Sequence, residues 1–174
     1  MSIRQFNQFI PQVHSSAYID QSAEVIGDVE VGENSSVWPM AVIRGDIQSI
    51  RIGQSTNIQD GSILHVTHDS QYQPGGYALN IGNLVTVGHG VILHGCTINN
   101  QCLIGMGSTI MDGVVIESNV MIAAGSLVTP GKLLKSGYLY MGLPAQKKRI
   151  LNNEEIEYLA YAANHYVKLK NQYK

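Results

Sequence analysis

The chain has 174 residues, with 11 lysine and arginine residues against 13 aspartate and glutamate residues, a net charge of −2. It carries no long basic block, so nucleic acid and anionic membranes are excluded as main partners. Residues 1–9 resemble no secretory signal, and no apolar run approaches the ~20 residues that cross a bilayer. We therefore expect one cytoplasmic domain with its own core.

The strongest pattern is an aliphatic residue that returns every six positions along most of the chain. A fixed period this short is typical of solenoid proteins. The pattern pauses before Ile52, Ile81 and Ile98, where inserted residues are expected to form loops on one side. The repeated residues are Val13, Ile19, Val25, Val31, Val37, Ile43, Ile52, Ile58, Leu64, Ile81, Val87, Leu93, Ile98, Ile104, Ile110, Ile116, Ile122 and Val128.

These 18 positions fall into six groups of three, which predicts an all-β solenoid of about six triangular coils. Each six-residue unit contributes a short strand and a corner, and parallel strands of adjacent coils lie about 4.8 Å apart. We assign residues 1–145 to this hexapeptide-repeat β-helix and residues 146–174 to a C-terminal helical segment.

After Pro144 the apolar spacing changes to that of an α-helix. Asn152 and Glu155 have the spacing of a capping box, and an apolar stripe follows them. The pattern predicts a helix over 153–172 that packs on the solenoid or on a neighbouring subunit. His165 within it is expected to be a surface or interface residue and not a ligand.

The repeat also indicates which distant residues stack. Arg44, His65 and His94 occupy the same position of three consecutive coils, so their side chains should be about 5 Å apart on one face. His89 lies on the preceding face, above Asp60. We infer a metal site shared between subunits, with His65 and His94 from one chain and His89 from the next, because three imidazoles and an open position suit catalytic zinc.

Simpler interpretations of the same residues remain open. A single histidine on a strand is usually structural. Arg44 and Asp46 could form an ordinary corner salt bridge of little energetic weight. Asp60 could cap a turn.

Several short motifs, taken together, resemble the gamma-class carbonic anhydrase family, in particular its short bacterial members. The resemblance covers nearly the whole chain. The motifs are Val42-Ile43-Arg44-Gly45-Asp46, Asn57-Ile58-Gln59-Asp60-Gly61, Leu64-His65, Gly88-His89, Leu93-His94-Gly95 and Gly142-Leu143-Pro144-Ala145.

This resemblance implies a left-handed parallel β-helix, a homotrimer, and a zinc held by His65, His89 and His94 at a subunit interface, with ferrous iron as an alternative metal. It also implies an intersubunit ion pair between Arg44 and Asp46. The implied substrate is a small molecule, carbon dioxide or bicarbonate. Zinc lowers the pKa of bound water from 15.7 to about 7, which makes hydroxide available for attack on carbon dioxide.

The resemblance further places Gln59 and Asp60 in the active site. Gln59 would orient the hydroxide, and Asp60 would accept a hydrogen bond from His89 and fix its tautomer. A group must also move the released proton to solvent. Ile47 stands where the family offers an acid, so His68 is the candidate for proton transfer, with a structural role for His68 as the alternative.

Two other functions stay open at this stage. Hexapeptide solenoids commonly serve acyl-coenzyme A chemistry, so the chain could be an acyltransferase, or a thioesterase that uses the same metal. Alternatively, the metal could only hold a catalytically silent trimer together.

Overall fold

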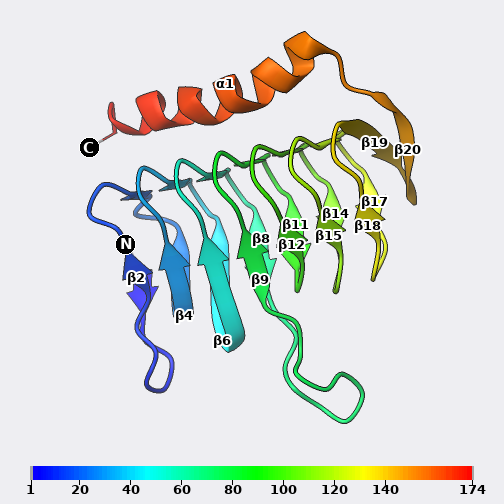
Figure 1. Cartoon of the computed structure of the whole chain (residues 1–174). Coiled ribbons are helices and arrows are strands. Elements are labelled where there is room, and N and C mark those ends of the chain that lie inside the picture. Colours follow the sequence, from blue (N-terminus) through cyan, green and yellow to red (C-terminus); the bar gives the residue numbers. More distant parts are fainter. Residues whose placement is uncertain (1, 174) are drawn as a thin grey trace.

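A computed structural model describes residues 2–173 as a parallel β-solenoid with one C-terminal helix (Figure 1). The strands form three stacked faces, and β4 (Glu24–Val31) and β6 (Val42–Ile52) each bend around a corner to serve two of them. The predicted solenoid is therefore confirmed, and its architecture is that of the left-handed hexapeptide-repeat β-helix.

The first face joins the N-terminal parts of β4 and β6 with β1 (Ser2–Arg4), β8 (Ile63–His65), β11 (Ile92–His94), β14 (Thr109–Ile110) and β17 (Leu127–Val128). The second face joins the C-terminal parts of β4 and β6 with β2 (Gln12–Val13), β9 (Leu79–Ile81), β12 (Thr97–Ile98), β15 (Val115–Ile116) and β18 (Leu133–Leu134).

The third face contains β3 (Tyr18–Ile19), β5 (Ser36–Val37), β7 (Asn57–Ile58), β10 (Thr86–Val87), β13 (Leu103–Ile104), β16 (Met121–Ile122) and β19 (Tyr138–Gly142). One antiparallel strand, β20 (Ala145–Ile150), pairs with β19 at the end of this sheet.

The repeated aliphatic residues point inward and form the core. Ile43 pairs with Leu64 and Leu64 with Leu93, and all three side chains are fully buried. Burying a side chain of this kind contributes about 1.5–3 kcal/mol, so the repeat stabilises the solenoid one rung at a time.

The six predicted coils are all present, but the solenoid extends beyond them at both ends. Ile3 pairs with Val25 before the first predicted coil, and Leu134 and Tyr140 continue the six-residue step after Val128. The last coil was not predicted because only one further aliphatic position, Leu134, follows Val128 before the aromatic Tyr140. The first was not predicted because a ten-residue interval separates Ile3 from Val13.

The C-terminal helix α1 (Asn153–Lys170) runs back along the third face toward the N-terminal end, where it contacts β5, β7 and β10 (Figure 1). Its predicted capping box is present, and it ends two residues earlier than predicted because Asn171 caps it. Since β20 lies ahead of α1, residues 146–174 hold a strand as well as the helix, and the division at residue 145 stays a prediction. In the described part of the chain, no helix combines the length and apolarity needed to cross a membrane.

Candidate metal centre

His65 and His94 form the centre of the candidate site. They are paired in register on the adjacent strands β8 and β11, and their rings lie 5.1 Å apart between centroids. His65 Nδ1 and His94 Nε2 face each other at 3.1 Å. The hexad register therefore brings together two imidazole nitrogens from residues 29 positions apart in the chain.

In each ring, the nitrogen that does not face the other histidine lies beside a carboxylate. His65 Nε2 lies 3.1 Å from Asp46 Oδ1, and His94 Nδ1 lies 2.7 Å from Asp112 Oδ1. If these nitrogens donate to the carboxylates, the two nitrogens that face each other both carry lone pairs. Two such acceptors at 3.1 Å require a proton or a cation between them.

The local charges favour the forms that a metal requires. Burial lowers the pKa of His65, and the positive charge of Arg44 adds to this effect, so the ring is neutral at neutral pH. Burial alone raises the pKa of Asp46, but hydrogen bonds from Arg44 and His65 outweigh it and hold this pKa below its usual value. A neutral imidazole backed by a carboxylate is the usual state of a metal-binding histidine.

Arg44 and Asp46 form an ion pair within one chain. Arg44 remains exposed, with 44% of its side chain accessible, whereas Asp46 is largely covered. The intersubunit role expected for this pair stays a prediction.

His89 lies on a different corner from His65 and His94. Its Nδ1 is 2.9 Å from Asp60 Oδ2, as the stacking of the two positions predicts, and about half of its side chain is exposed. Across residues 2–173, no group of three or more histidine, cysteine, aspartate or glutamate side chains of the single chain could hold a metal ion. A third ligand from His89 would have to come from another copy.

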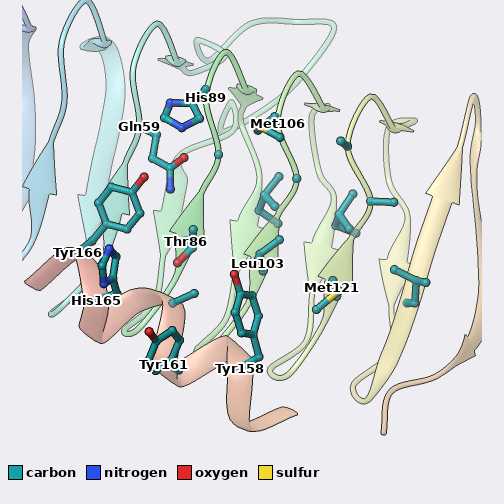
Figure 2. A pocket seen from close by; sticks show the side chains of 18 residues that line it. Gln59, Thr86, His89, Leu103, Met106, Met121, Tyr158, Tyr161, His165 and Tyr166 are labelled. Carbon is teal, nitrogen blue, oxygen red and sulfur yellow. The ribbon is translucent and has the colours of Figure 1, made fainter. Parts of the chain in front are cut away.

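Gln59 shares a groove with His89. The groove has a volume of about 580 Å³ and lies between the third face and α1 (Figure 2). Gln59 is largely buried, and its amide nitrogen donates to Asn57 Oδ1 at 3.0 Å. The opposite side of the groove is formed by α1 and is lined by Tyr158, Tyr161, His165 and Tyr166.

His68 lies away from these residues, on the loop 66–78 between β8 and β9. In Figure 1 this loop extends away from the side that α1 covers. His68 is exposed, and in residues 2–173 its side chain makes no hydrogen bond to any of the three candidate ligands. Its role in proton transfer stays a prediction.

The sequence analysis did not identify Asp112 or Thr67. Asp112 accepts a hydrogen bond from Thr67 Oγ1 at 3.0 Å as well as contacting His94. One signal was available: Asp112 stacks one coil beyond Gly95, where a β-carbon would come within 2.3 Å of Asp112 Oδ1. A glycine directly after a candidate ligand makes room for this carboxylate.

Similarities to known proteins agree with this arrangement. Residues 95–130 match the family described as bacterial transferase hexapeptide (six repeats). The chain is 54% identical over 171 residues to YrdA of Escherichia coli, covering 98% of this chain and 93% of YrdA. It is 43% identical over 159 residues to mitochondrial gamma carbonic anhydrase 1 of Arabidopsis thaliana, covering 91% of this chain and 58% of that protein.

Among solved structures, a hexapeptide transferase family protein from Anaplasma phagocytophilum superimposes with a TM-score of 0.91 at 42% identity, covering 99% of this chain and 98% of that one. The fold therefore defines a hexapeptide-repeat protein. The chain is also 44% identical over 164 residues to a carbonic anhydrase of Geobacillus kaustophilus, covering 94% of this chain and 86% of that protein. Within the hexapeptide-repeat class, the chain therefore belongs to the gamma carbonic anhydrase family, which confirms the resemblance inferred from its motifs.

Proposed function

We propose that this protein is a metal-dependent enzyme that catalyses the reversible hydration of carbon dioxide to bicarbonate. The observation that carries this proposal is the pair of imidazole nitrogens that face each other at 3.1 Å, each ring backed by a carboxylate. Two nitrogen ligands of a tetrahedral zinc, each 2.0–2.1 Å from the metal, are about 3.3 Å apart. The pair therefore fits zinc with little movement, and imidazoles also suit ferrous iron.

His89 of a neighbouring copy is the proposed third ligand, which makes the functional unit a homotrimer. Asp60 supports this role because it accepts at His89 Nδ1 and leaves Nε2 free for a metal. When bound, zinc lowers the pKa of water to about 7, which supplies hydroxide for attack on carbon dioxide near neutral pH.

Gln59 is the proposed orienting residue. Its donation to Asn57 Oδ1 holds the amide, and Asn57 is itself fixed by donation to Thr86 Oγ1 at 3.0 Å. An amide held this way loses little rotamer freedom when it positions a water or substrate oxygen beside His89.

The test combines the metal content of the purified protein with its carbon dioxide hydration rate, under aerobic and anaerobic conditions. We expect about one zinc or iron per chain, and loss of both metal and hydration in His94→Ala, because two imidazoles seldom hold catalytic zinc. His14→Ala is the matched control, since His14 directly follows β2 on the second face, where its Nδ1 lies 2.8 Å from Ser16 Oγ. Full zinc occupancy without hydration in either condition contradicts the proposal.

Acyl transfer or thioester hydrolysis is the second candidate, favoured by the largely apolar groove beside His89. Acyl-coenzyme A assays on the same preparations separate it from hydration. Metal-dependent assembly without turnover of either substrate would instead indicate a silent, metal-stabilised trimer.

A further inference from the structure

His165 stands in the same groove as two proposed site residues. Helix α1 presents its imidazole to the cavity that His89 and Gln59 line from the solenoid side (Figure 2). The residue is exposed, so its ring is open to solvent as well as to the groove. It is therefore open both to the groove and to bulk water.

Neighbouring aromatic rings hold His165 in place. Its ring stacks on Tyr161, with the ring centroids 6.3 Å apart, and meets Tyr166 edge-on, with the centroids 6.0 Å apart. Tyr166 is in turn packed edge-on against Trp38 of the solenoid at 5.3 Å. These contacts fix the ring on a helix that is anchored at its far end by donation from Lys170 Nζ to Ser16 O at 3.0 Å.

The groups facing His165 carry little charge on the helix side. Burial raises the pKa of Tyr166, and the negative charge of Asp60 adds to this, so Tyr166 stays a neutral phenol. Tyr158 and Tyr161 are the other titratable groups of α1 in the groove. His89 faces the groove from the solenoid, and Asp60 lies beside His89 Nδ1. The side chain of Tyr166 points from α1 toward Gln59 (Figure 2).

Hydration of carbon dioxide releases one proton for each bicarbonate formed, and this proton must reach a base in solution. An imidazole is the side chain that exchanges protons most readily near neutral pH. His68 is on the loop 66–78, outside the groove, whereas His165 lines it.

We propose that His165 is the proton-transfer residue of this groove: its neutral ring accepts the proton through groove water and then gives it to a buffer base. The inference rests on the proposed hydration activity. No other group is consumed, because the ring returns to its neutral form in each cycle.

The test compares His165→Asn, His68→Asn and His14→Asn with the wild-type protein. In dilute buffer we expect kcat of His165→Asn to fall on the order of 100-fold, the lower end of typical acid–base contributions, with kcat/KM little changed. Concentrated imidazole buffer should restore kcat. Metal content and Tm should match the wild type, and His14→Asn should behave as wild type throughout.

A second measurement does not depend on activity. Because the His165 ring is exposed, diethyl pyrocarbonate should modify it in the metal-free protein, and mass spectrometry should locate the adduct on this residue. A His165 ring that does not react overturns the proposal, as does an unchanged kcat for His165→Asn in dilute buffer. A fall in kcat confined to His68→Asn would assign proton transfer to His68 on the loop 66–78. Absence of hydration by the wild-type protein would instead contradict the proposed function.

Discussion

At the scale of single residues, the carboxylates behind the two histidines determine what the pair can do. Asp46 and Asp112 hold the outer nitrogens, so the inner nitrogens can only face each other. Gly95 is needed for this geometry, because its φ is +50° and a β-carbon there would strike Asp112. Partners of this kind orient metal ligands and raise their basicity.

We expect Asp112→Asn to weaken zinc binding about 10- to 100-fold, the usual cost of losing a carboxylate behind a ligating histidine. The amide keeps the shape but does not stabilise His94 as a strong ligand. Competition with a zinc chelator measures the affinity. Asp69→Asn, on the loop 66–78, is the control and should bind zinc as the wild type does. An unchanged affinity in Asp112→Asn would mean that Asp112 is only a structural neighbour.

The residues of the site differ in how far the sequence predicts them. The His65–His94 and His89–Asp60 contacts follow from the repeat, because hexad register alone decides which positions stack. Asp112 does not share the hexad position of His94 and reaches it diagonally, so the register gives no direct signal. The position of His165 depends on how α1 is rotated about its axis, which the apolar stripe defines only coarsely.

At the scale of the elements, the start of α1 is held by a network of side chains. Glu155 accepts two hydrogen bonds from Arg149, both at 2.7 Å, and one from the backbone nitrogen of Asn152 at 3.0 Å. The Asn152 side chain completes the capping box by accepting from Glu155 N at 2.8 Å. Strand β20 and helix α1 are thereby joined at a fixed angle, which places the helix over the groove.

The hydrogen bonds from Arg149 lower the pKa of Glu155 to about 2. Because the folded-state pKa lies below the ordinary value of 4.5, the stabilisation is full above pH 4.5 and disappears as the pH falls toward 2. We expect Glu155→Gln to lower Tm at pH 6, and we expect this loss of Tm to become smaller as the pH is lowered from 4.5 toward 2. Thermal unfolding followed by circular dichroism at 222 nm measures the difference.

Asn152→Ala is the comparison for this experiment. It removes a cap worth about 1 kcal/mol, equivalent to roughly 2–4 °C in Tm for a chain of this size. The Asn152 side chain does not titrate, so the loss of Tm in Asn152→Ala should not disappear between pH 4.5 and pH 2 as the loss in Glu155→Gln does. A Glu155→Gln effect that is constant from pH 6 to pH 2 would contradict the assigned ion pair.

At the scale of the whole molecule, the proposed site is divided between two corners of the solenoid. His65 and His94 lie on the first face, whereas His89 lies at the end of a strand of the third face beside α1. The stiffness of the stacked coils keeps these corners apart in a single chain. In a closed three-fold ring, each interface brings unlike surfaces of two copies together, so every interface can complete one site.

This arrangement predicts complementation between two inactive variants. His65→Ala chains retain His89, and His89→Ala chains retain His65 and His94. Each variant alone forms no complete site, but random mixing in co-expressed trimers leaves about one quarter of the interfaces with all three ligands. We expect zinc content and hydration to recover toward that fraction. A mixture of His65→Ala with His94→Ala should recover nothing, because both changes damage the same corner. Full zinc occupancy in a stable monomer would refute the divided site.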